Sequence, residues 1–206
     1  MKLLPAKEKK ERALGTKLGL KPYRSLSPKS AMTRRPYRPG VHGAKRTRAG
    51  SEFKTQLMEK QKVKLTYGLN ETQLKRVFKT ALGNKKEPIL QSILNQLELR
   101  LDNVVYRLGF APSRIMGRQM VSHGHFTVNG RKVNIPSYHV RAGDIIGIRE
   151  ARKNMPLFKD LKNTLKGRKE SWMKVNEQDI TGTVTGSPEQ VDLPFNLNLV
   201  IDYYAR

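Results

Sequence analysis

The spacing of apolar residues changes at Gly124 from a helical period to a strand period. Before that point apolar residues recur three or four positions apart, and after it Phe126-Thr127-Val128 and Arg131-Lys132-Val133 flank the dipeptide Asn129-Gly130. An Asn-Gly pair between two such runs favours a tight hairpin, because both turn positions adopt positive φ. Helices followed in sequence by a small antiparallel sheet predict an α+β fold.

Four helical segments are expected before this hairpin, and one further strand after it. Asn70 and Gln73 form a capping box at the start of one helix, and a long helix is expected to bend near Asn95. The first helix is interpreted as basic and amphipathic. Its apolar face is Phe53, Leu57, Met58 and Leu65. The expected helices are 52–65, 70–83, 88–109 and 113–123, and the expected further strand is 144–149.

The chain is strongly basic, and the charge is unevenly distributed. Its 206 residues include 41 Lys and Arg against 17 Asp and Glu, a net charge of +24. Residues 1–50 hold 15 basic and 2 acidic side chains and are rich in Pro and Gly, which predicts a flexible arm that orders on a partner. Residues 175–206 are acidic instead and are expected to pack on protein.

Such an excess of positive charge calls for an anionic partner, either a phosphate polymer or an acidic membrane surface. The membrane alternative is weaker, because the basic segment contains Pro and Gly rather than one amphipathic helix. No stretch approaches the roughly 18 apolar residues of a spanning helix, and the first residues contain no apolar secretory segment. We therefore expect a soluble, unexported protein that does not contact a membrane.

The sequence contains little that indicates catalysis or a metal site. It has no Cys, no phosphate-binding glycine loop and no dinucleotide motif, so we expect no enzymatic activity, no cofactor and no structural metal. His123-Gly124-His125 could bind a metal ion, but no carboxylate or thiol lies next to it in the sequence. A role for His123 at the helix end or at a phosphate is the preferred interpretation.

Arg114 and Arg118 lie four residues apart in the first turns of a predicted helix. Like charges at this spacing repel, and the helix dipole also disfavours cations there. A phosphate held at the helix start would reverse this effect, because backbone N–H groups and two guanidinium groups would converge on it. The alternative is that Arg114 pairs with Asp102 while Arg118 is solvated.

Two further segments are candidates for binding nucleic acid. Residues 34–46 combine arginines, an aromatic ring and glycines that allow the backbone to approach a phosphate chain closely. Tyr67 follows Lys62 and Lys64 and could stack on a base, although a tyrosine at a helix end is as often part of the core.

Several motifs resemble a known family. Residues 100–114, 118–124 and 128–130 closely resemble the S4 RNA-binding domain, which also occurs in pseudouridine synthases and some tRNA synthetases. Upstream, Pro39-Gly40-Val41-His42-Gly43 and residues 59–68 resemble the family of small-subunit ribosomal protein four, bacterial type. The chain lacks the zinc-binding cysteine cluster of many members, and it has Gly117 where an Ala is common.

The resemblance implies a structural constituent of the small ribosomal subunit in the cytoplasm, and it leaves an organellar ribosome open. Such a protein binds small-subunit rRNA directly, nucleates assembly of its five-prime domain, contacts ribosomal protein five, lines the mRNA entry region and contributes to translational accuracy. The alternatives are an RNA-modifying enzyme with an S4 module and a free RNA-binding translational regulator. An enzyme would need a catalytic domain, and the 97 residues before the module are too basic and too poor in acids to provide one.

The sequence thus predicts four parts: a basic N-terminal arm (1–50), a helical domain (51–97), an S4 RNA-binding domain (98–161) of two helices on a small antiparallel sheet, and a C-terminal segment (162–206) that packs back on the helical domain. We expect RNA contacts from three of these parts. The predicted RNA-binding residues are Arg34, Arg35, Arg38, Gly40, His42, Gly43, Lys45, Arg46, Arg48, Lys62, Lys64, Tyr67, Arg107, Ser113, Arg114, Arg118, His123, Asn129 and Arg131.

Overall fold

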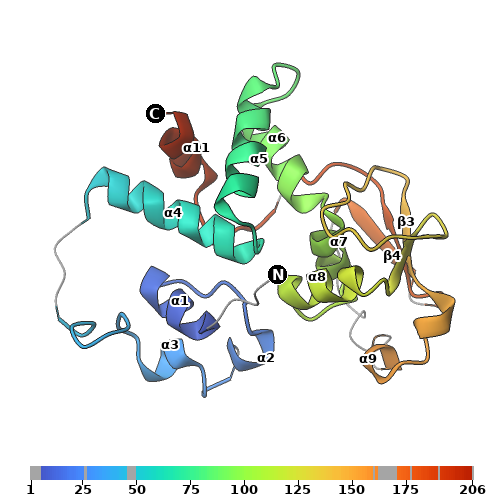
Figure 1. The fold of residues 1–206 in the computed structure, drawn as a ribbon, viewed down its shortest axis with the longest axis horizontal. Coiled ribbons are helices and arrows are strands. Elements are labelled where there is room, and N and C mark those ends of the chain that lie inside the picture. The colour runs from blue at the N-terminus through green and yellow to red at the C-terminus, as the bar shows by residue number, and fades with distance from the viewer. Residues whose placement is uncertain are drawn as a thin grey trace. The chain divides into compact units, whose positions relative to one another are not determined.

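The computed structural model describes residues 6–25, 27–45, 50–159, 161, 171–176, 178–189 and 191–205 (Figure 1). The chain forms two compact units, the first of Met1–Lys79 with Asp192–Arg206 and the second of Thr80–Val191. The regular elements in the described part of the first unit are helices, and the second unit combines helices with one antiparallel sheet. The predicted α+β class is confirmed.

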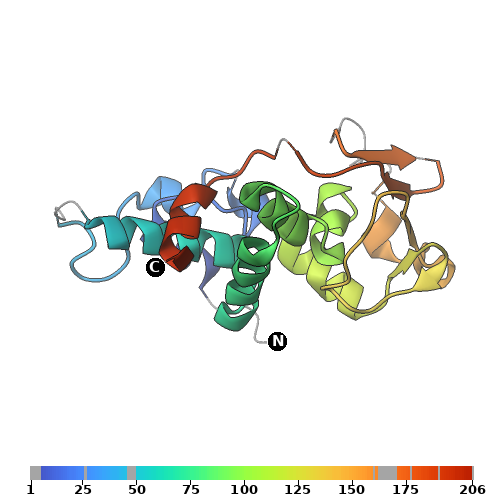
Figure 2. The same ribbon diagram turned by 90° about the horizontal axis from the view of Figure 1, so that it is seen from above.

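The first unit is built around a long central helix, α4. The short helices α1, α2 and α3 precede it, and the C-terminal helix α11 lies against it (Figure 2). Asn70 and Gln73 form the predicted capping box, since Gln73 N donates to Asn70 Oδ1 at 2.7 Å and Asn70 N donates to Gln73 Oε1 at 3.2 Å. The helices are α1 (Lys7–Leu14), α2 (Pro22–Ser25), α3 (Ala31–Arg34), α4 (Glu52–Thr66), α5 (Glu71–Gly83), most of which lies in this unit, and α11 (Leu197–Ala205).

The start of the basic arm makes local contacts through a buried acid. Glu11, on α1, is buried, and its Oε1 accepts hydrogen bonds from Leu18 N at 3.0 Å and Leu20 N at 3.1 Å. Both leucines are themselves buried. One internal acid and two apolar residues therefore give the start of the arm local contacts, and its flexibility without a partner stays a prediction.

The buried face of α4 differs from the predicted apolar face. Phe53 is half exposed, whereas Gln56, Glu59 and Lys60 are buried. Lys60 has partners on other helices, whereas Gln56 donates to Glu52 and Glu59 accepts from Lys62, both within α4. Glu71 accepts from Lys60 Nζ at 2.8 Å and from Tyr204 Oη at 3.1 Å, which ties α4 to α5 and α11. Leu65 is buried as predicted, so hydrophobic spacing assigned the face correctly at that end of α4 and missed the buried polar residues, whose pairing it does not register.

The second unit contains two helices where one bent helix was predicted. The helix is interrupted at Leu99–Arg100, between α6 and α7, and not near Asn95. Backbone partners from a distant segment replace the helical hydrogen bonds there, with Leu101 N donating to Tyr138 O at 2.9 Å and Val140 N donating to Leu99 O at 2.8 Å. The helical elements of this unit are α6 (Ile89–Glu98), α7 (Leu101–Arg107), α8 (Arg114–Ser122), α9 (Pro156–Lys159) and the single-turn η1 (Glu150–Arg152).

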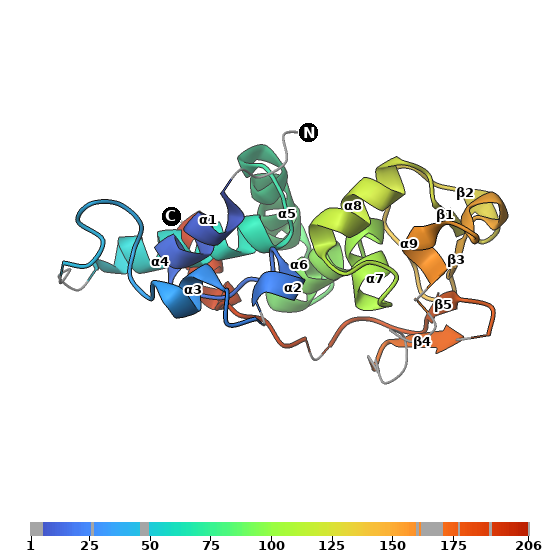
Figure 3. The ribbon, with the colours of Figure 1, turned by 90° about the horizontal axis from the view of Figure 1, so that it is seen from below.

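The sheet of the second unit has five strands in the order β2-β1-β3-β5-β4, all antiparallel (Figure 3). The predicted hairpin is present, with Val128 opposite Arg131 and positive φ at Asn129 and Gly130. Two strands come from the segment that was expected to pack on the helical domain, and that assignment is wrong for residues 173–184. The strands are β1 (Phe126–Val128), β2 (Arg131–Lys132), β3 (Ile145–Ile148), β4 (Met173–Asn176) and β5 (Thr181–Val184).

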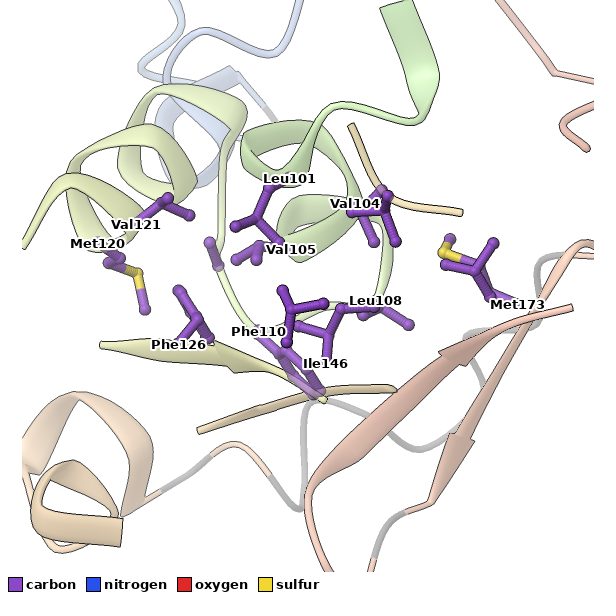
Figure 4. Packing of buried hydrophobic residues seen from close by; sticks show 14 of the residues in the cluster. Leu101, Val104, Val105, Leu108, Phe110, Met120, Val121, Phe126, Ile146 and Met173 are labelled. Atoms are coloured by element: carbon purple, nitrogen blue, oxygen red, sulfur yellow. The ribbon is translucent and has the colours of Figure 1, made fainter. Parts of the chain in front are cut away.

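One hydrophobic core joins α7 and α8 to this sheet (Figure 4). Leu101 and Val105 on α7 and Leu108, which follows it, pack with Phe126 of β1 and Ile146 of β3, and all five are almost fully buried. Leu108 lies so close to β5 that a Cβ at Gly182 would collide with its side chain. This packing holds α7 and α8 rigidly on the sheet, so the polar side chains between these two helices occupy fixed positions.

Candidate nucleic-acid interface

Four arginines and two acids gather around α7 and α8 in the second unit. Arg100 precedes α7, Arg107 ends it, and Arg114 and Arg118 lie on the first two turns of α8. The acids are Glu98, at the end of α6, and Asp102, on α7. We call these six residues, together with Asn103, the arginine cluster. With four guanidinium groups and two carboxylates, the cluster carries a net charge of +2.

Glu98 is the centre of one half of the cluster. Its side chain is fully buried, and its carboxylate accepts from Arg107 Nε at 2.9 Å and from Arg107 Nη2 at 3.1 Å. Asn103 Nδ2 donates to the same carboxylate at 2.7 Å, while Asn103 Oδ1 accepts from Arg114 Nε at 2.7 Å. The Arg114 guanidinium also lies over the ring of Tyr106, 4.6 Å from its centroid. Arg107 and Arg114 are therefore held by a buried acid and an amide bridge.

Asp102 organises the other half of the cluster. Arg100 donates to both of its oxygens, at 3.1 and 2.9 Å, and Arg118 Nη1 lies 3.6 Å from Oδ2. The predicted alternative had paired Arg114 with Asp102 and left Arg118 solvated. The structure corrects this pairing, because Arg118 faces Asp102 and Arg114 faces Asn103 and Glu98.

Arg118 remains a strong cation within this environment. Burial lowers its pKa, the Asp102 carboxylate opposes that effect, and Arg100 lowers the pKa further. An arginine stays protonated at neutral pH despite such shifts. Burial and the neighbouring cation thus outweigh Asp102 in their effect on the pKa of Arg118.

The two arginines on α8 avoid the mutual repulsion expected from their spacing because each faces an acid of the preceding helices. Ser113 caps α8, since its Oγ accepts from Met116 N at 3.2 Å, and its side chain is largely buried. Gly117 lies between the two arginines, where a Cβ would be 2.7 Å from the backbone oxygen of Asp102. Gly117 therefore permits the close approach of α7 and α8 that brings the cluster together.

The hairpin and the end of α8 present further predicted residues to solvent. His123, Asn129 and Arg131 are all exposed. Asn129 has a structural role as well, because its Nδ2 donates to Asp144 Oδ1 at 2.8 Å and its Oδ1 accepts from Ile145 N at 2.9 Å. His125 is buried and packs on Phe158, so it is poorly placed to bind a ligand from solution.

The described residues offer no support for a metal site at this histidine pair. His123 and His125 have ring centroids 6.0 Å apart. Burial lowers the pKa of His125, with smaller contributions from Arg152 and His123, which favours a neutral core histidine. Across the part of the chain that the structure describes, no group of three or more His, Cys, Asp and Glu side chains could hold an ion.

The predicted arm residues lie in the first unit, at the end of α3 and on the loop that follows it, which we call the arm loop. Arg34, Arg35, His42 and Lys45 are exposed, and Arg38 is half-buried. Arg46 and Arg48 lie outside the described residues. Gly40 has a φ of 104°, which favours glycine, and a Cβ at Gly43 would collide with the backbone oxygen of Arg38. The two glycines therefore shape a compact loop that carries these cations.

Arg12 on α1 orders this loop, although nothing in the sequence pattern singled it out. Its guanidinium donates to the backbone oxygens of Arg35 at 3.0 Å and of Tyr37 at 2.9 Å, and it lies over the Tyr37 ring, 5.1 Å from the centroid. A single arginine in a lysine-rich helix has no sequence signature that would separate it from a solvated cation. Only the folded contact reveals its role.

The third predicted group, also in the first unit, is mainly structural. Lys62 Nζ donates to Glu59 at 2.6 Å and Lys64 Nζ donates to Glu71 at 2.9 Å. Tyr67 is buried, and its ring meets that of Phe195 edge-on at 6.2 Å. A buried ring cannot stack on a nucleotide base, so the stacking expectation is wrong for Tyr67, and the alternative of a core residue at the helix end holds.

Two family models match consecutive parts of the chain. Residues 2–98 match the model of the ribosomal protein S4/S9 N-terminal domain, and residues 99–146 match that of the S4 domain. The small ribosomal subunit protein uS4 of Thermus thermophilus is 47% identical over 196 residues, which cover 93% of each chain. That of Desulfitobacterium hafniense is 43% identical over 194 residues, with the same coverage. The chain belongs to the uS4 family of ribosomal proteins.

Membership of the uS4 family places the arginine cluster within a recognised domain. Most of the cluster lies between residues 99 and 146, on the S4 domain, and Glu98 ends the N-terminal match. The family is one of structural, non-enzymatic proteins, in agreement with the expectation that this chain is not an enzyme. Among the described residues, no helix has the length and apolar character needed to cross a membrane.

Proposed function

We propose that this uS4-family protein is a structural component of the small ribosomal subunit and binds small-subunit rRNA directly. The observation that carries this proposal is the arginine cluster: four guanidinium groups fixed between two rigidly packed helices, with two positive charges in excess. Planar guanidinium groups held in place match the oxygens of a phosphate chain. The net charge of +24 supplies the long-range attraction to RNA.

The arm loop provides a second basic surface in the first unit. Arg35 and Lys45 are exposed on it, Arg34 is exposed at the end of α3 beside it, and Arg12 fixes its backbone. We extend the proposal to binding at the five-prime domain of the rRNA and to early assembly of that domain. Contacts with ribosomal protein five and the mRNA entry region, and a contribution to translational accuracy, belong to the same proposal. The same proposal divides the chain into an RNA-binding arm, a helical domain that includes the C-terminal helix α11, and an S4 domain whose sheet includes β4 and β5.

A binding experiment with a transcript of the rRNA five-prime domain tests this function. We expect the affinity to fall steeply with salt, with log K linear in log salt concentration, because each neutralised phosphate releases counterions. The double variant Arg114→Lys and Arg118→Lys keeps the charge but loses the planar groups, and we expect about tenfold weaker binding. Filter binding is measured beside thermal melting on the same sample, because both arginines also contact protein groups.

Two results would contradict the proposal in different ways. An affinity of the unaltered protein that hardly changes between low and physiological salt would exclude phosphate contacts as its main source. Unchanged affinity in a fully folded double-lysine sample would exclude the guanidinium groups of this pair, and the RNA surface would then be assigned to the arm.

A further inference from the structure

We infer that Glu98 and Asn103 are positioning residues for rRNA binding, although one is an acid and both are buried. This inference rests on the proposed function. Glu98 is fully buried beneath Arg107, and Asn103 is 1% exposed. Neither side chain is placed to contact a nucleic acid, yet together they bond the guanidinium groups of Arg107 and Arg114.

The charge of Glu98 makes its presence informative. A carboxylate under an RNA-binding surface weakens the attraction to phosphate, and replacing a whole buried ion pair with packed apolar groups is often neutral for stability. An acid in this place is therefore useful if it fixes the arginines. An arginine side chain has several rotatable bonds and loses conformational entropy when it binds RNA. A buried partner that already holds the side chain removes this entropy cost from the binding step.

The hydrogen bonds form a continuous chain from one arginine to the other. Arg107 donates twice to Glu98, Glu98 accepts from Asn103 Nδ2, and Asn103 Oδ1 accepts from Arg114. Asn103 Nδ2 also donates to the backbone oxygen of Glu98 at 2.8 Å, which anchors the chain to the end of α6. Glu98 and Asn103 thus fix the distance and relative orientation of Arg107 and Arg114.

The inference predicts an effect opposite to simple electrostatics. Glu98→Gln raises the net charge by one, so long-range attraction alone would strengthen RNA binding. If Glu98 orients the arginines, the same substitution weakens binding by about tenfold, because the charged hydrogen bonds that hold Arg107 are lost. The matched control is Glu150→Gln, which makes the same charge change at a side chain that is 84% exposed and pairs with Lys153.

The experiment measures filter binding of the full chain to the five-prime-domain transcript over a range of salt concentrations. For Glu98→Gln we expect weaker binding and a shallower dependence on salt, since fewer phosphates are neutralised. For Glu150→Gln we expect affinity equal to or slightly above that of the unaltered protein. If Glu98 had a purely structural role, Glu98→Gln would lower the folded fraction but leave the slope of log K against log salt concentration unchanged. The salt dependence of binding therefore separates a positioning role from a structural one.

A folded Glu98→Gln variant that binds as tightly as Glu150→Gln would overturn the inference. If Glu98→Gln does not fold, Asn103→Ala takes its place, because it breaks the bridge to Arg114 without changing any charge. Weaker binding by its folded fraction supports the inference, and unchanged binding overturns it. Failure of the unaltered protein to bind the transcript would instead overturn the proposed function, so the two failures are distinguishable.

Discussion

Replacing Gly117 with alanine sets two effects of opposite sign against each other. In a helix, alanine is favoured over glycine by about 1 kcal/mol, so helix propensity alone would stabilise the protein. The added Cβ, however, would lie 2.7 Å from the backbone oxygen of Asp102 and 3.5 Å from Cβ of Ala111. The first contact is with backbone on a packed helix, so α7 and α8 must separate, and overpacking of this kind costs about 1–3 kcal/mol.

We therefore expect Gly117→Ala to destabilise the second unit by about 1 kcal/mol, since the steric cost exceeds the gain in propensity. The chain has a single tryptophan, Trp172, which is 2% exposed in the core of this unit. Its fluorescence during urea unfolding reports on that core. The midpoint should fall while the slope of the transition stays unchanged, because the same surface is exposed on unfolding.

Gly83→Ala is the matched control for this experiment. Gly83 is the last residue of α5, and a Cβ there would meet nothing within 4 Å. We expect no loss of stability from it. A Gly117→Ala protein as stable as the control would refute the reasoning, because it would show that α7 and α8 can separate without cost. The arginines on α8 would then have no fixed distance from Asp102.

Two further predictions concern the first unit. Burial raises the pKa of Glu71, but hydrogen bonds from Lys60 and Lys64 outweigh this and lower it from 4.5 to about 2. Glu71→Gln should therefore cost about 1 kcal/mol above pH 5, after allowance for a side chain that is 45% exposed. This difference in unfolding free energy should vanish as the pH falls from about 4.5 towards 2, because Glu71 becomes protonated. Chemical denaturation of both proteins across this range measures it, and a difference that grew at low pH would contradict the prediction. The amides of Leu18 and Leu20 should exchange slowly in the RNA-free protein, because both donate to buried Glu11. Fast exchange at both would show that the arm is unfolded without RNA.

Local signals in the sequence predicted local structure well. The capping box of Asn70 and Gln73 and the turn at Asn129-Gly130 are both formed as expected. Each depends on residues at most three positions apart, so a short stretch of sequence is enough to predict it. The α+β class followed from the same kind of pattern, because the change of period at Gly124 lies between α8 and β1.

Long-range contacts decided the features that the sequence did not predict. The break at Leu99–Arg100 exists because residues 136–140 supply backbone partners, and the apolar pattern runs through the break without change. Strands β4 and β5 are four residues each, and β5 contains Gly182 where Leu108 requires space. A small residue chosen for a distant neighbour weakens the local strand signal, which explains why this segment was assigned elsewhere.

The candidate site shows the same division at the level of single side chains. Basic residues at the start of α8 were recognisable because their spacing is locally unfavourable. Their partners were not, since the break between α6 and α7 determines whether Arg114 or Arg118 faces Asp102. A continuous helix through residues 98–102 would give Glu98 and Asp102 the spacing of one helical face. The break instead gives each acid its own arginines, so the geometry of the cluster depends on the contact with residues 136–140 as much as on the arginines themselves.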